Sequence, residues 1–160
     1  MNIEKEMSLD QTDLKILKIL QANGRISNAD LGRELGMVPS GVFERIKKLE
    51  QKGAIQHYTT VINPEALQQK LLAFVFLKVT DGQGHVEITS KIAEIPEVQE
   101  VHHIAGDDCY LIKIRTYDTA SLTHLMRNKF PFIPNLVSTR TTIVLETVKE
   151  QQQLVIPDQL

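Results

Sequence analysis

The sequence predicts an α+β protein of two small domains, a mainly helical first part and a second part in which strands alternate with helices. Its 160 residues suffice for one ordinary domain or two small ones. From Leu9 to Lys52 apolar residues recur at helical spacing, whereas from Leu71 onward β-rich runs alternate with helical ones. The Asn63-Pro64 pair disfavours a helix or strand across the join. We therefore expect domains at residues 1–62 and 63–160.

Three helices are predicted in the first domain. The first opens at Asp10, a good N-cap residue. The second opens at Ser27, whose hydroxyl can cap the first amides, and it ends before Gly36. The third begins at Pro39, which suits the first helical position, and stops at Gly53. Two helices joined by a tight turn that contains glycine are typical of a helix-turn-helix.

The third helix has the composition of a DNA-recognition helix. Val42, Ile46 and Leu49 fall on one face, which leaves the other residues for solvent or a partner. A recognition helix presents its N-terminal end to base edges in the major groove and basic residues to phosphates. A solvated face is the simpler interpretation of such a charge run, and the preceding helix and turn favour DNA. The expected DNA-contacting residues are Arg25, Ser27, Ser40, Gly41, Phe43, Glu44, Arg45, Lys47 and Lys48.

The segment after the third helix has strand-like residues. Ile55, His57, Thr59 and Val61 alternate with Ala54, Gln56, Tyr58 and Thr60. β-Branched and aromatic residues are frequent in this run. We expect it to form the wing of a winged helix-turn-helix.

The second domain has the β-α-β-β-α-β order of a ferredoxin-like fold. The expected elements are a strand over 71–79, a helix over 85–95, strands over 98–104 and 109–115, a helix capped by Asp118 and a strand over 136–148. The first strand is apolar on both faces, so both faces need cover. One open four-stranded sheet leaves one apolar face free, which predicts dimerisation through the sheet.

The turn between the two middle strands is a candidate site for a small molecule. Its residues are Gly106, Asp107, Asp108 and Cys109. A glycine exposes backbone amides to a ligand carboxylate, and an acidic side chain can pair with an ammonium group. These are the two charges of a free amino acid. A solvated hairpin turn is the alternative.

Charge is divided unevenly along the chain. The whole carries 18 basic and 20 acidic residues, a formal charge of -2, so it lacks a strong basic field. Residues 1–62 carry nine basic and eight acidic residues (+1), and residues 63–160 carry nine and twelve (-3). Because one copy offers few basic groups, we expect several linked domains of an oligomer to bind one duplex.

Composition and motifs also predict what the chain lacks. Its longest apolar run, residues 71–77, is far shorter than the roughly 20 residues that cross a bilayer, and no signal peptide is evident. We expect a cytoplasmic protein with no membrane contact. The single Cys109 excludes an internal disulfide, and the adjacent His102 and His103 should point to opposite faces of a strand. No metal, cofactor or catalytic residue is expected, because no phosphate loop, nucleophile elbow or HExxH motif occurs.

Taken together, the motifs resemble those of the leucine-responsive regulatory protein/AsnC (Lrp/AsnC) family of feast/famine regulators. The resemblance rests on LDQTDLKIL, the GRIS turn, ERIKKLEQKGAIQHY and IAGDDCYLIKIR, and continues into LVSTRTTIVLETVK, so it covers nearly the whole chain. It implies a winged helix-turn-helix DNA-binding domain followed by a ferredoxin-like effector domain. The implied function is sequence-specific transcription regulation on double-stranded DNA, modulated by an amino acid at an interface between dimers. Assembly as dimers, and often octamers, is also implied.

Two positions depart from the family pattern. Where the family commonly has glycine, a variable residue, an aromatic residue and aspartate, this chain has the residues from Gly106 to Cys109. The identity of the effector is therefore open. Many relatives have serine where this chain has Val38, and losing a side-chain cap costs about 1 kcal/mol. The alternatives are an effector-independent architectural protein that wraps DNA, and an amino-acid-binding regulatory module without DNA activity.

Overall fold

The computed structural model describes residues 8–80 and 85–159, which form two compact units. Of the described residues, the first unit contains 8–61 together with the C-terminal tail 150–159, and the second contains 62–80 and 85–149. The tail thus differs from the expected division, which placed it in the second domain. It lies with the first unit because the side chain of Gln21 hydrogen-bonds both backbone groups of Leu154. Gln21 and Leu154 are 133 positions apart, so the sequence did not predict this contact.

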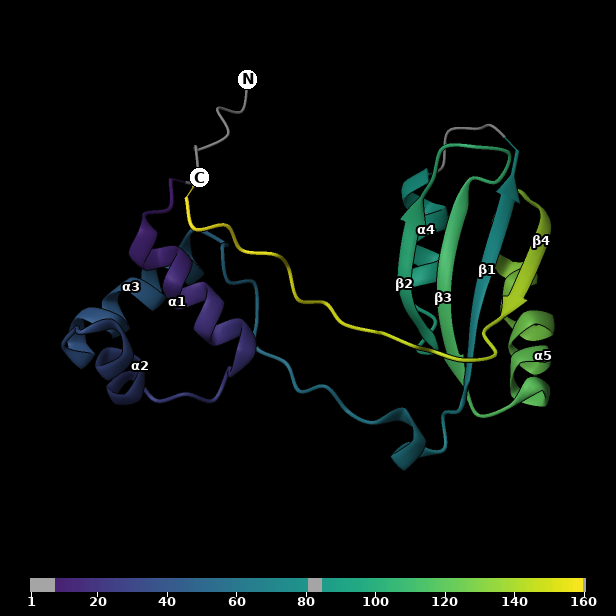
Figure 1. The fold of residues 1–160 in the computed structure, drawn as a ribbon. Coiled ribbons are helices and arrows are strands. Elements are labelled where there is room, and N and C mark those ends of the chain that lie inside the picture. Colours follow the sequence, from purple (N-terminus) through teal and green to yellow (C-terminus); the bar gives the residue numbers. More distant parts are fainter. Residues whose placement is uncertain (1–7, 81–84, 160) are drawn as a thin grey trace, which may run out of the picture. The chain divides into compact units, whose positions relative to one another are not determined.

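Three helices build the described part of the first unit (Figure 1). They are α1 (Gln11–Ala22), α2 (Asn28–Leu35) and α3 (Pro39–Gln51). The Asp10 and Ser27 side chains cap α1 and α2 as predicted, each by accepting a backbone N–H three residues on. α3 begins at Pro39 without a side-chain cap. Ile16, Leu31, Val42 and Leu49 form the buried centre of this unit.

The turn between α2 and α3 packs tightly on α2. A Cβ atom on Gly32 would lie 2.6 Å from the carbonyl oxygen of Met37. The same turn is held by a hydrogen bond of 2.8 Å from the Met37 N–H to the Gly32 carbonyl. Glycine at position 32 therefore permits the close approach of the turn to α2.

The predicted wing strand is not formed. Ala54 and Ile55 pack half-buried against the helical core, and residues 56–63 are exposed. A strand is stable only when neighbouring strands complete its backbone hydrogen bonds. Within the described residues, the sheet consists of four strands that all belong to the second unit, so this segment has none to pair with.

The second unit has the predicted β-α-β-β-α-β order. Its elements are β1 (Leu71–Val79), α4 (His85–Ala93), β2 (Val98–His103), β3 (Tyr110–Thr116), α5 (Thr119–Asn128) and β4 (Leu136–Ile143), with short 3-10 turns at Pro64–Leu67 and Phe130–Phe132. The strands are antiparallel in the order β2-β3-β1-β4. β4 ends earlier than the predicted residue 148, because its partner β1 begins at Leu71 and the last pair joins Ala73 to Ile143. None of the described helices is long and apolar enough to span a membrane.

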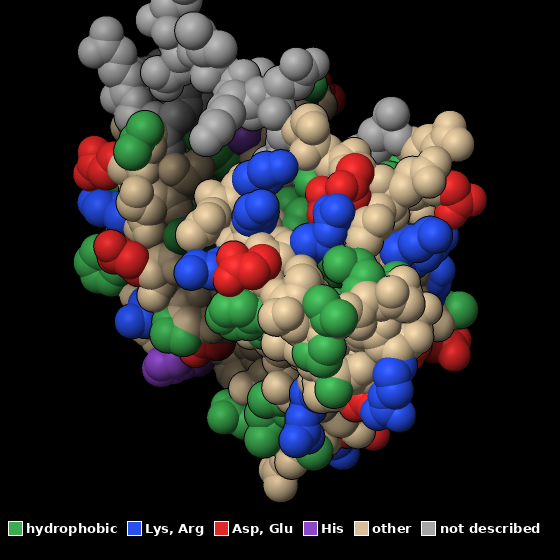
Figure 2. All heavy atoms as spheres, turned by 90° about the vertical axis from the view of Figure 1, so that its left-hand side faces the viewer, with side chains coloured by type: hydrophobic (Ala, Val, Ile, Leu, Met, Phe, Trp, Pro, Cys, Tyr) green, Lys and Arg blue, Asp and Glu red, His purple; other side chains and the backbone are tan. Residues whose placement is uncertain are grey.

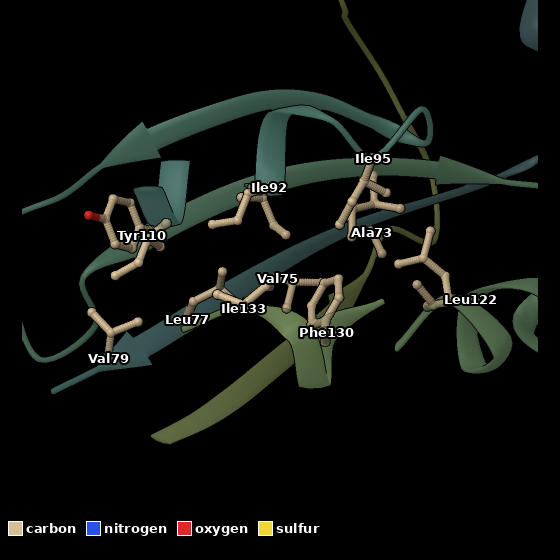
Figure 3. Packing of buried hydrophobic residues seen from close by; sticks show 14 residues of the cluster. Ala73, Val75, Leu77, Val79, Ile92, Ile95, Tyr110, Leu122, Phe130 and Ile133 are labelled. Atoms are coloured by element: carbon tan, nitrogen blue, oxygen red, sulfur yellow. The ribbon is translucent and has the colours of Figure 1, made fainter. Parts of the chain in front are cut away.

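Both helices of this unit cover one face of the sheet (Figure 1). Val75 and Leu77 of β1 point towards Ile92 of α4 and Phe130 after α5 (Figure 3), and all four are buried. The opposite face of the sheet, which the sequence predicted to be apolar and uncovered, is partly covered by a side chain of β4. There, the guanidinium carbon of Arg140 lies 3.9 Å from the centre of the Phe76 ring and covers part of it.

Candidate nucleic-acid interface and effector site

The N-terminal half of α3 presents side chains to solvent. Ser40, Phe43 and Glu44 are exposed, whereas Val42 is buried in the helical core. Phe43 keeps 51% of its surface accessible, which is high for a large apolar residue. Gly41 is half-buried beside the side chains of Met37 and Val38. The structure therefore brings the predicted base-contacting residues together on one end of one helix.

Two lysines continue this exposed surface along α3. Lys47 and Lys48 are exposed, and neither forms an ion pair with another described residue. On the face drawn in Figure 2, Lys and Arg side chains occur in small groups among acidic ones and do not form one continuous basic surface. Lys47 and Lys48 are therefore available to bind phosphates. They form a small basic group on α3.

Two of the three remaining predicted residues, Arg25 and Ser27, lie at the start of α2. Arg25 is exposed in the turn that precedes the helix. The Ser27 hydroxyl is already engaged, because it accepts the Asp30 N–H at 3.1 Å and donates to the Asp30 carboxylate. Asp30 in turn pairs with Arg33. Ser27 thus has a structural role at the helix start, whatever else it contacts.

Arg45 differs from the other predicted DNA-contacting residues. It is half-buried, and its guanidinium pairs with Asp10 at 2.7 Å and Asp13 at 2.8 Å. Hydrogen bonds to Asp10 and Asp13 raise the pKa of Arg45 above its ordinary value. The pKa of Asp10 is lowered, first by the Asp13 amide that it caps and then by Arg45. The sequence placed Arg45 on a basic helix, and its acidic partners became evident only in the fold.

The predicted effector loop joins β2 to β3. Gly106 has a φ of 145°, which side chains rarely adopt, so glycine is needed at this turn. Asp107 is exposed, whereas Asp108 forms an ion pair of 2.7 Å with Arg140 of β4. Sequence analysis missed Arg140, because the pairing of β4 with β1 that brings it near the loop depends on register.

Cys109 closes the loop against β1. Its N–H donates to the Leu77 carbonyl at 2.8 Å, and its thiol lies 3.6 Å from the Val79 carbonyl. The thiol is half-buried. Cys109 therefore anchors the loop to the sheet, with Asp107 exposed and Asp108 half-buried in its pair with Arg140.

The neighbouring histidines contact different partners. His102 lies 3.2 Å from the Glu100 carboxylate, which also binds Lys113 at 2.9 Å. The hydrogen bond from Lys113 is the main cause of the lowered pKa of Glu100. The His103 ring lies 5.2 Å from that of Tyr110. No group of three potential metal ligands occurs among the described residues.

Comparison with known proteins identifies the family. Residues 72–154, more than half of the chain, match the model of the Lrp/AsnC ligand binding domain. The chain belongs to the Lrp/AsnC family. Residues 9–56 match a winged helix-turn-helix DNA-binding model, which covers α1, α2 and α3. This Lrp/AsnC protein is thus a DNA-binding transcription regulator with a ligand-binding domain, and not an enzyme.

Relatives of the Lrp/AsnC protein match along almost the whole chain. It is 38% identical to the leucine-responsive regulatory protein of Haemophilus influenzae over 158 residues, covering 98% of this chain and 95% of that protein. The protein of the same name from Escherichia coli K12 is 37% identical, with 92% of each chain covered. Among solved structures, a transcriptional regulator from Neisseria meningitidis in complex with L-Met has a TM-score of 0.86 at 27% identity, covering 92% of this chain and 97% of that one. E. coli AsnC has a TM-score of 0.84 at 25% identity, covering 94% and 99%.

Proposed function

We propose that this Lrp/AsnC regulator contacts double-stranded DNA by placing α3 in the major groove. The observation that carries the proposal is the exposure of Ser40, Phe43 and Glu44 at one end of α3, followed by Lys47 and Lys48, which are exposed and form no ion pair with another described residue. A helix fits the major groove of B-DNA, where its first turns can contact base edges. The two lysines then lie where phosphates bind. Arg25, at the start of α2, is a further phosphate contact.

The salt dependence of binding tests this placement. Each phosphate contact contributes about 0.9 to the slope of log affinity against log salt concentration. The double variant Lys47→Glu and Lys48→Glu should bind duplex DNA more weakly, and its slope should be smaller by about two units. Lys91→Glu on α4 reverses one lysine in the other unit and serves as the control for charge reversal outside the proposed interface. Unchanged affinity and slope in the double variant would contradict the proposed interface.

We further propose that a free amino acid is the effector and binds beside the loop from Gly106 to Cys109. Asp108 and Arg140 together provide partners for an ammonium group and a carboxylate. The relative from N. meningitidis, whose structure was solved with L-Met, supports this ligand class. Because Asp108 and Arg140 pair with each other at 2.7 Å, an amino acid must replace that contact with two of its own.

Calorimetric titration of the full-length protein with each of the twenty amino acids tests the effector. We expect at least one to bind, and the variants Asp108→Asn and Arg140→Gln to weaken that binding. Sedimentation of the same samples would show whether the ligand changes the oligomer. Absence of both binding and any change in oligomer would favour an architectural protein that wraps DNA without an effector.

Assembly into dimers, and of dimers into an octamer, is the arrangement we propose for this regulator in the cytoplasm. Phe74 and Phe76 are half-buried on the sheet face that lies opposite α4 and α5. A second copy would complete their burial. The near-neutral charge of the chain also favours several linked helix-turn-helix units on one duplex. Replacing Phe74 with glutamate should reduce the sedimentation coefficient, and an unchanged oligomer would exclude this face.

A further inference from the structure

Arg45 joins the start of α1 to the middle of α3 through a closed set of hydrogen bonds. Its Nη1 lies 2.7 Å from Oδ2 of Asp10 and 2.8 Å from Oδ1 of Asp13. The remaining oxygens are also used: Oδ1 of Asp10 accepts the Asp13 N–H at 2.8 Å, and Oδ2 of Asp13 accepts the Asp10 N–H at 3.2 Å. All four carboxylate oxygens therefore have a donor. We name this arrangement the Asp10–Arg45–Asp13 latch.

The latch is more enclosed than an ordinary surface ion pair. The Asp13 side chain keeps 12% of its surface accessible, and that of Arg45 keeps 34%. Removing one partner from such a pair leaves a poorly hydrated charge without compensation, which costs more than breaking an exposed pair. Rotation of Arg45 towards a phosphate would leave Asp13 in this state. The guanidinium is therefore retained by α1.

The latch supplies a directional contact that the apolar core lacks. Val42 and Leu49 hold α3 in the core by burial, which depends on contact area and little on angle. Charge-assisted hydrogen bonds from a guanidinium are directional and fix the geometry of both partners. Since Arg45 lies between the exposed Glu44 and Lys47 along α3, its anchoring restrains rotation of the helix about its own axis.

We propose that Arg45 is a positioning residue, which holds α3 at the rotation needed to enter the major groove and makes no phosphate contact itself. The inference rests on the proposed docking of α3 into DNA. It also assigns a role to the two aspartates of the LDQTDLKIL motif, which cap α1 and orient the recognition helix with the same two side chains.

Two variants of the full-length protein distinguish positioning from direct contact. Arg45→Gln should lower DNA affinity by about fivefold, the lower end of the cost of one lost base contact, with an unchanged salt slope. Asp13→Asn removes a negative charge and one of the two carboxylates that hold Arg45, so a direct phosphate contact would strengthen binding. If Arg45 positions α3, Asp13→Asn should instead lower DNA affinity, by about as much as Arg45→Gln does. The asparagine oxygen can still accept the Asp10 N–H, so α1 keeps its capping box.

The controls separate this inference from the docking of α3. Asp158→Asn makes the same chemical change in an exposed pair with Lys18, and should leave DNA affinity unchanged. Lys48→Gln should reduce the salt slope by about one unit, and an unchanged slope there would contradict the docking of α3 instead. Positioning by Arg45 is overturned if Arg45→Gln reduces the slope by about one unit. It is equally overturned if Asp13→Asn binds DNA as tightly as, or more tightly than, the native chain.

Discussion

Replacing Gly32 with alanine should destabilise the helix-turn-helix, although alanine is the better helix former. The added Cβ would lie 2.6 Å from the Met37 carbonyl oxygen, whereas ordinary contacts begin at 3.4 Å. That oxygen belongs to the backbone of the turn, so it cannot swing aside as a side chain can. Overpacking of this kind costs about 1–3 kcal/mol, and the gain in helix propensity returns about 1 kcal/mol. Because a contact of 2.6 Å against backbone belongs to the upper part of that range, about 2–3 kcal/mol, we expect a net loss of about 1–2 kcal/mol in the free energy of unfolding.

Hydrogen exchange of the amides in α1, α2 and α3 measures this loss within the first unit. A loss of 1–2 kcal/mol should accelerate exchange by global opening by about 5–30-fold. Gly41→Ala is the matched control, because its Cβ would meet only side-chain atoms at 3.6 Å. That variant should slow exchange through its helix propensity. Exchange in Gly32→Ala that is as slow as in the native chain would refute the proposed steric role of Gly32.

Three further changes probe the first unit. Val38→Ser should raise the free energy of unfolding in chemical denaturation by about 0.5–1 kcal/mol, because α3 gains the side-chain cap that it lacks. An unchanged free energy of unfolding would show that the valine side chain stabilises the protein as much as a serine cap does. Asp10→Asn should lower stability near pH 6, and the difference from the native chain should shrink as the pH falls through about 4 and below. The reason is that the folded pKa of Asp10 is lowered, so its stabilising charge is complete above the unfolded pKa and is lost on acidification; a pH-independent difference in unfolding free energy would contradict this linkage. Gln21→Ala should speed exchange of the Leu154 amide by about fivefold, since a hydrogen bond contributes about 1 kcal/mol, and an unchanged rate would mean that Gln21 does not hold the tail.

The sequence predicted elements better than it predicted contacts between them. Caps at Asp10 and Ser27 act within one turn, and the alternation in β1 requires only that its two faces differ, so both were evident without a fold. The strand expected over 54–61 is not formed, because strand-like residues there do not supply a partner strand. β4 was predicted too long for a related reason, since its end depends on where β1 begins.

In the candidate sites, too, features within one element were predicted and contacts between elements were not. The exposed end of α3 follows from helical spacing and was predicted, whereas Arg140 beside Asp108 depends on how β4 pairs with β1. The family comparisons support the DNA-binding and ligand-binding roles of the two regions. The individual residues of both sites remain predictions that the variants above test.

By itself, the sequence determined the order of helices and strands, the helix caps and the family, because these depend on neighbouring residues and on short motifs. Only the tertiary structure decided which charges meet. Arg45 belongs to a basic helix in the sequence and to a pair of aspartates, 32 and 35 positions away, in the fold. An ion pair forms between groups that are close in space, and spacing along the chain contains no direct measure of that distance. Arg45, expected from the sequence as a DNA contact, is thus the residue that we propose orients α3.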